Sequence, residues 1–138
     1  MLAVEQPSFD PDQASRFLLT AERTGLEVIL LLTKTDLLSA AALERLVTRL
    51  KGWGYDPLAL SSAAGTGIDA LRQRLAGAQL SVLCGPSGVG KSSLLNQLRP
   101  DLQLRTAAVS GRLQRGRHTT PWPVAMGVSM WVQQKLNP

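Results

Sequence analysis

The stretch CGPSGVGKSSLLNQL, residues 84–98, contains a complete phosphate-binding loop with the pattern Gly85-x-x-x-x-Gly90-Lys91-Ser92. Its glycines let the backbone curl so that several N–H groups converge on phosphate oxygens. The helix expected to begin near Lys91 adds its positive N-terminal end. The Lys91 ammonium is expected to reach the β- and γ-phosphates, and the Ser92 hydroxyl to hold Mg²⁺. The predicted phosphate-binding residues are Gly85, Pro86, Ser87, Gly88, Val89, Gly90, Lys91, Ser92 and Ser93.

The composition is typical of one globular domain. The chain has 138 residues, 44% of them hydrophobic, which is enough for one core. It has no apolar run of about 18 residues and no basic-then-apolar leader, so neither a membrane span nor a secretory signal is expected. A single cysteine fits the reducing cytoplasm, where we expect the protein to act. One cysteine and one histidine cannot provide the ligands of a structural zinc site.

Charge is distributed unevenly along the chain. Residues 1–78 carry eight Lys or Arg against nine Asp or Glu, whereas residues 79–138 carry seven against one. The excess positive charge therefore lies at or beyond the phosphate loop. This indicates an anionic partner, nucleotide or RNA. The alternative is that this half of the chain has lost its acidic complement.

Apolar segments alternate with amphipathic helical patterns. Asp10 is expected to cap a first helix and Ser39 a second one, and Val28 to Leu32 form a continuous apolar run typical of a strand covered on both faces. The predicted helices are residues 10–25, 39–52, 67–75 and the segment after residue 90. The predicted strands are residues 28–32, 56–62 and 79–85, and residues 1–7 are interpreted as the tail of a further strand. This alternation predicts an α/β fold with a parallel sheet.

The segment Thr33-Lys34-Thr35-Asp36 directly follows the apolar run and resembles the guanine-reading motif of GTPases, usually Asn-Lys-x-Asp. A carboxylate accepts two hydrogen bonds, from N1–H and the 2-amino group of guanine, which adenine cannot offer. The lysine stem can lie along the base. Thr33 is shorter than asparagine, which leaves open whether it ties the loops together. Asp36 alone has another interpretation, as a cap of the next helix.

A second polar loop, SSAAGTG at residues 61–67, follows the next predicted strand. It resembles the second guanine-contacting loop of GTPases, in which a backbone N–H meets the base oxygen, and Ser62-Ala63 is the best match. In ordinary GTPases the phosphate loop comes first, whereas here both base loops precede it. We interpret the leading residues as the second half of a GTPase domain moved to the front, a circular permutation that a parallel sheet tolerates.

The chain resembles the circularly permuted, small-ribosomal-subunit-dependent GTPases of bacteria, the RsgA or YjeQ family. The resemblance covers residues 1–120 and rests on AVEQPSFDPDQASRFL, TKTDLL, SSAAGTGIDAL, GPSGVGKSSLLNQL and GRHTT. It implies that GRHTT belongs to the first switch loop. Thr119 or Thr120 would then meet Mg²⁺ and the γ-phosphate, and His118 would position the attacking water, with a solvated loop histidine as the alternative. Arg112, Arg115 and Arg117 either contact rRNA or lie in an exposed loop.

After Thr120 the sequence departs from the family. The family continues into an Asp-Thr-Pro-Gly motif that supports Mg²⁺ and senses the γ-phosphate, whereas residues 121–138, PWPVAMGVSMWVQQKLNP, contain no Asp or Glu. We therefore expect a partial, circularly permuted GTPase domain at residues 1–120, without the second switch, and a divergent tail at residues 121–138 without regular order. A fragment is the expected origin, and a genuine short variant is the alternative. The strand that feeds the phosphate loop is expected to be an exposed sheet edge.

Three functions are weighed. The first is a GTPase of small-subunit biogenesis that binds GTP or GDP with Mg²⁺ and meets the small ribosomal subunit and its rRNA, with no membrane partner. The second is a non-catalytic module that binds nucleotide or ribosome, since the residues for hydrolysis are incomplete. The third is a guanylate-kinase-like enzyme, which the loop GPSGVGKSSL alone also resembles; the acid-free tail argues against it. Cys84 is interpreted as a packed strand-end residue, with a reactive thiol as the alternative.

Overall fold

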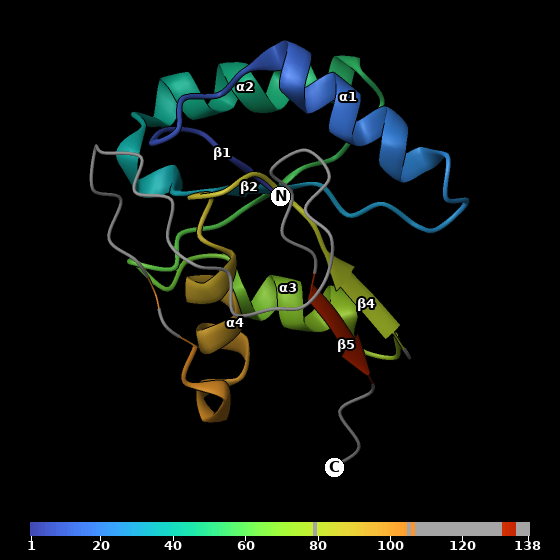
Figure 1. Cartoon of the computed structure of the whole chain (residues 1–138). Coiled ribbons are helices and arrows are strands. Elements are labelled where there is room, and N and C mark those ends of the chain that lie inside the picture. Colours follow the sequence, from blue (N-terminus) through green and yellow to red (C-terminus); the bar gives the residue numbers. More distant parts are fainter. Residues whose placement is uncertain (79, 105, 107–130, 135–138) are drawn as a thin grey trace.

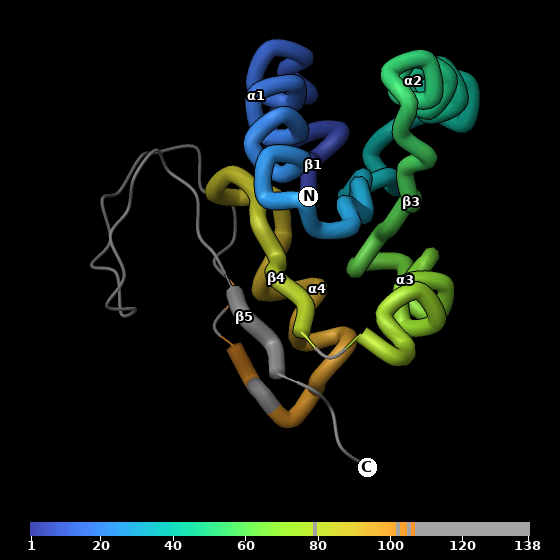
Figure 2. The backbone as a smooth tube through the Cα atoms, turned by 90° about the vertical axis from the view of Figure 1, so that its right-hand side faces the viewer, coloured from blue at the N-terminus to red at the C-terminus, as the bar shows by residue number. Residues whose placement is uncertain are grey.

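The computed structural model describes residues 1–78, 80–104, 106 and 131–134. Three parallel strands form its central sheet in the order β1-β2-β3, and their bounds are β1 Leu2–Ala3, β2 Leu31–Thr33 and β3 Leu58–Ala59. Helices α1 (Pro11–Glu22) and α2 (Ala40–Gly52) cover one face. Helices α3 (Ile68–Leu75) and α4 (Lys91–Leu98) lie on the opposite side (Figures 1 and 2). The predicted α/β fold with a parallel sheet is confirmed.

The first two helices begin at the predicted caps. The Asp10 carboxylate accepts hydrogen bonds from the backbone N–H groups of Asp12 and Gln13, at 2.9 and 3.2 Å. The Ser39 hydroxyl accepts one from Ala42 N–H at 3.3 Å. Each cap pairs N–H groups that have no partner inside their own helix, and this fixes where the helix begins.

Strand β2 is shorter and lies later than the apolar run Val28 to Leu32 predicted. It starts at Leu31 because the ladder extends only as far as its neighbours, which are two residues long each. The run is nevertheless buried on both faces, as predicted. Leu30 and Leu32 point to the α1/α2 side, and Leu31 to the α3/α4 side.

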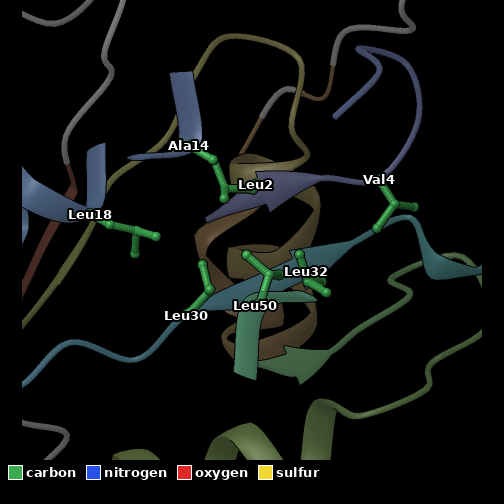
Figure 3. Packing of buried hydrophobic residues seen from close by; sticks show 7 residues of the cluster. All are labelled: Leu2, Val4, Ala14, Leu18, Leu30, Leu32 and Leu50. Carbon is green, nitrogen blue, oxygen red and sulfur yellow. The ribbon is translucent and has the colours of Figure 1, made fainter. Parts of the chain in front are cut away.

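Two apolar clusters result from this arrangement. The first gathers on the α1/α2 side around β1 and β2 (Figure 3) and consists of Leu2, Val4, Ala14, Leu18, Leu30, Leu32 and Leu50. The second lies on the α3/α4 side and consists of Leu31, Leu60, Ile68, Leu71 and Leu94. The second cluster includes residues from both the base-loop half and the phosphate-loop half of the chain, so it joins the two halves.

Strand β4 (Leu80–Leu83), which feeds the phosphate loop, is not an unpaired edge. It pairs antiparallel with β5 (Trp131–Gln134), in the register Leu80 with Gln134 and Leu83 with Trp131. This pairing covers one side of β4, which remains an edge strand of a two-stranded sheet, with Leu80 and Val82 exposed. Its partner strand comes from residues 131–134 of the segment that was expected to lack regular order. The residue after β4, Cys84, is half-buried, and its carbonyl oxygen accepts a hydrogen bond from the Met1 amino group at 2.9 Å.

Two short 3₁₀ helices complete the described structure, η1 (Thr35–Leu37) after β2 and η2 (Pro100–Leu102) after α4. The chain that leaves η2 is held by Asn96, whose side-chain amide both donates to Leu104 O and accepts from Leu104 N–H, each at 2.8 Å. None of the helices in the described part of the chain has the length and apolar character needed to cross a bilayer.

Candidate guanine nucleotide site

The phosphate loop connects β4 to α4, and two glycines set its path. A Cβ atom on Gly85 would lie 2.4 Å from the carbonyl oxygen of Met1, so only glycine fits where the loop passes the start of the chain. Gly90 has a φ of 91°, in the left-handed region, and immediately precedes α4. The loop therefore ends at the positive N-terminal end of a helix, an arrangement suited to binding anions.

Lys91 is folded back over this loop. It is 9% exposed, and its ammonium donates to the carbonyl oxygens of Gly85 and Pro86, at 2.8 and 2.6 Å. Burial lowers the pKa of Lys91 below its ordinary value, and the neighbouring Cys84 opposes this shift. Because neutral carbonyl groups are weaker acceptors than anions, a phosphate in the loop would be a stronger partner for this ammonium.

Ser92 provides a hydroxyl group that fits a Mg²⁺ ion carried by a nucleotide. It lies half-buried in the first turn of α4, beside Lys91. No group of three His, Cys, Asp or Glu side chains gathers among residues 1–78, 80–104, 106 and 131–134. Mg²⁺ is commonly held by substrate phosphates with few protein oxygens, which suits a lone hydroxyl at the end of a phosphate loop.

Thr33 joins the first base loop, residues 33–36, to the phosphate loop. It is buried, and its hydroxyl lies 2.7 Å from Val89 O and 3.2 Å from Leu2 O. A hydroxyl has one proton, so the shorter contact identifies Val89 as the main acceptor. A threonine thus makes a loop-tying contact at this position, which resolves the point that its short side chain left open.

The remaining residues of the first base loop take different directions. Lys34 has a φ of 60°, and its ammonium donates to Gln6 O in the loop after β1. Burial lowers the pKa of Lys34, and the nearby Asp36 opposes that shift. Thr35 is buried, and both its backbone N–H and its hydroxyl donate to Leu60 O, at 3.2 and 3.1 Å. Thr35 therefore ties β2 to β3, whereas Asp36 is exposed.

The second base loop is connected to the first through Ser61. The buried Ser61 hydroxyl donates to the Asp36 carboxylate and accepts from Ala64 N–H at 3.1 Å. The backbone of Ser61 also pairs with Thr66 in both directions, at 3.1 and 3.0 Å, and closes the loop. Ser61, which the sequence motif did not single out, thus orients Asp36, while Ser62 and Ala63 lie at the turn.

These loops surround one cleft, with a volume of about 380 Å³. The predicted site residues that line it are Thr33, Lys34, Asp36, Ser62, Ala63, Val89, Gly90 and Ser93. Base-loop and phosphate-loop residues therefore face a common space. The other predicted phosphate-loop residues are not among those that line this cleft. His118, Thr119, Thr120 and the three arginines Arg112, Arg115 and Arg117 lie outside the described residues.

Three further residues line the cleft without having been predicted: Gln6, Leu37 and Gln97. Leu37 follows Asp36 directly, so its place in the sequence was a usable signal. Gln6 and Gln97 reach the cleft from the loop after β1 and from the last turn of α4. No local pattern marks them, because their position depends on how β1 and α4 pack beside β2.

Replacing Thr33 with valine is expected to destabilise the fold by about 1–3 kcal/mol, because Val89 O would be left buried without its donor. The side chain keeps its shape, so the loss isolates the hydrogen bond. Urea unfolding measures it, with the exposed helical substitution Thr48→Val as the matched control. An unfolding midpoint equal to that of the control would show that this contact contributes nothing to stability.

Comparisons with known proteins agree with this arrangement. The chain matches the family model of the RsgA GTPase over residues 1–128. It is 97% identical over 120 residues to the small ribosomal subunit biogenesis GTPase RsgA of Synechococcus sp. (strain CC9605), and this alignment covers 87% of this chain and 40% of that protein. The protein of the same name from Trichormus variabilis is 49% identical over 120 residues, covering 87% of this chain and 32% of the relative.

The crystal structure of YjeQ from Thermotoga maritima superimposes with a TM-score of 0.62 at 33% identity, covering 77% of this chain and 38% of that chain. The chain thus spans two fifths or less of the length of each of these three proteins. The family match covers most of the chain, including both base loops and the phosphate loop. The chain belongs to the RsgA GTPase family.

Proposed function

We propose that this chain is the guanine-nucleotide-binding part of a GTPase that acts in small ribosomal subunit biogenesis. One observation carries the proposal: residues from the Thr33–Asp36 motif, the Ser61–Gly67 loop and the phosphate loop line the same cleft. The Asp36 carboxylate supplies two acceptors for the N1–H and 2-amino groups of guanine, and Lys91 with the loop backbone supplies the phosphate site. An adenine base offers no matching pair of donors.

The order of these parts supports a circularly permuted GTPase domain. The base-reading motif at residues 33–36 comes before the phosphate loop at residues 85–92, yet the hydrogen bond from Thr33 to Val89 brings the two together. A parallel sheet allows this, because packing depends on which strands are neighbours. The family match over residues 1–128 includes both base loops and the phosphate loop in this order.

Within this proposal Ser92 and the nucleotide phosphates would hold a Mg²⁺ ion, which would supply neutralisation of phosphate charge. Thr119 is the further candidate ligand, and His118 the candidate for positioning water during hydrolysis. The small ribosomal subunit and its rRNA are the proposed partners, and the cytoplasm is the proposed location. For this chain the proposal covers binding, and hydrolysis is assigned to the longer proteins of the family.

Selective binding of GDP over ADP tests the proposal. We expect the purified full chain to bind fluorescent GDP at least about 100-fold more tightly than fluorescent ADP, because ADP would leave the Asp36 carboxylate without donors. Competition with the unlabelled nucleotides excludes binding through the fluorescent group. Equal affinity for both nucleotides would indicate a phosphate loop without base recognition, and binding of neither would contradict the proposal.

A further inference from the structure

Gln97, near the end of α4, touches the second base loop. Its side-chain amide donates to Ser62 O at 3.0 Å, and its side chain lines the cleft. The backbone of Gln97 is held separately, because its carbonyl oxygen accepts from the guanidinium of Arg72 on α3 at 2.7 Å. Arg72 is in turn paired with Asp69 at 2.8 Å. Helices α3 and α4 lie side by side (Figure 2), so the two helices together carry Gln97 to the loop.

The hydrogen bond from Gln97 to Ser62 O fixes the orientation of the whole peptide group between Ser62 and Ala63. Ser62 C=O and Ala63 N–H belong to the same planar peptide group, and in a trans peptide they point in opposite directions. A donor bound to Ser62 O therefore sets the direction of Ala63 N–H. Within the described residues Ala63 N–H has no acceptor, whereas the next N–H, that of Ala64, is already bound to the Ser61 hydroxyl.

We infer that Gln97 is a positioning residue that aims Ala63 N–H at the 6-oxo group of a bound guanine. The inference rests on the proposed function, and it adds a specificity-determining residue from outside the three sequence motifs. In this arrangement the Asp36 carboxylate would accept hydrogen bonds from N1–H and the 2-amino group of guanine, and Ala63 N–H would donate one to the 6-oxo group. Gln97 would affect only the contact between Ala63 N–H and the 6-oxo group, because Asp36 is oriented separately by Ser61.

Two substitutions separate the hydrogen bond from packing. Gln97→Glu keeps the size of the side chain but has no donor for Ser62 O when ionised, and Gln97→Lys restores a donor. Gln97 is exposed, and the bond from Arg72 reaches its backbone, so neither change removes a core contact. Gln73→Glu, at an exposed position on α3, is the matched control.

The measurement compares GDP with two analogues on the full chain. In 6-thio-GDP the 6-oxo oxygen is replaced by sulfur, a weaker acceptor, and IDP lacks only the 2-amino group. We expect wild type and Gln73→Glu to prefer GDP over 6-thio-GDP by about five- to tenfold, about the value of one hydrogen bond. In Gln97→Glu this preference should fall to about twofold or less, and Gln97→Lys should recover it. The GDP preference over IDP should stay at the wild-type value throughout.

Each other outcome overturns the inference in a distinguishable way. An unchanged preference for GDP over 6-thio-GDP in Gln97→Glu would show that Gln97 does not act on the 6-oxo contact, while the proposed function stands. Equal losses of both preferences would mean that Gln97 supports the whole site rather than one contact. A wild-type chain with no selectivity for GDP over ADP would overturn both this inference and the proposed function.

The charge that each substitution adds at position 97 does not affect the comparison. GDP and 6-thio-GDP carry the same charge, so its effect cancels in the ratio of their affinities.

Discussion

Replacing Asp36 with asparagine is expected to shift the base preference of the chain from guanine to xanthine. Asp36 lines the cleft, and its carboxylate offers two acceptors. Asparagine offers one acceptor and one donor. The acceptor still matches N1–H, but the donor faces the 2-amino group of guanine, which is itself a donor. Xanthine has an oxygen at that position, so it restores both hydrogen bonds.

The expected size of this effect is a loss of about 100-fold in GDP affinity, since a hydrogen bond to a charged group contributes about 1.5–3 kcal/mol. Xanthosine diphosphate should bind the variant more tightly than it binds wild type. Competition titrations against a fluorescent nucleotide measure both affinities. Asp12→Asn, at an exposed position of α1, is the matched control. If the variant kept the wild-type preference for GDP over xanthosine diphosphate, Asp36 would not read the base.

Replacing Lys91 with methionine is expected to lower GDP affinity by about 100-fold and to leave the binding of guanosine nearly unchanged. The ammonium is buried against the phosphate loop, where Gly85 O and Pro86 O accept its hydrogen bonds. With a nucleotide in the loop it would bind phosphate oxygens, and these charge-assisted bonds are about twice as strong as neutral ones. Guanosine has no phosphate, so only the base cleft would hold it.

Thermal unfolding provides a second readout for Lys91→Met. GDP at 100 times the wild-type Kd should stabilise wild type by about 2.7 kcal/mol, and a variant that binds 100-fold more weakly by only about 0.4 kcal/mol, so the rise in melting temperature should be much smaller in the variant. The matched control is Lys51→Met, which removes an exposed lysine at the end of α2 that pairs with Asp56. A variant that gains as much thermal stability from GDP as wild type would contradict a phosphate role for Lys91.

Helix starts were predictable from the sequence because their causes are local. Asp10 and Ser39 bond to N–H groups two or three residues away, and such short spacings are visible in a sequence. Strand lengths were not predictable in the same way. The strand expected at Val28 to Leu32 became β2 at Leu31–Thr33, because a ladder is limited by partner strands elsewhere in the chain.

The same difference between local and long-range causes applies to the candidate site. The sequence placed Asp36 just after a strand and Lys91 at the start of a helix, and the structure has both there. Their roles in binding a nucleotide stay predictions. The contacts that orient the base loops could not be predicted. Ser61 reaches Asp36 across 25 residues, Gln97 reaches Ser62 across 35, and both depend on packing between elements. The pairing of β4 with β5 was missed for the same reason, as the tail shows no alternation of its own.

The division of the core into two clusters has a consequence for synthesis of the chain. Every residue of the first cluster lies between Leu2 and Leu50, whereas the second needs Leu94 from α4. At about 5–20 residues per second, the ribosome would make Leu94 several seconds after Leu50. During that interval the second cluster would lack Leu94, although Leu31, Leu60, Ile68 and Leu71 precede it in the chain. Until α4 emerges, only the first of these two clusters could therefore be complete.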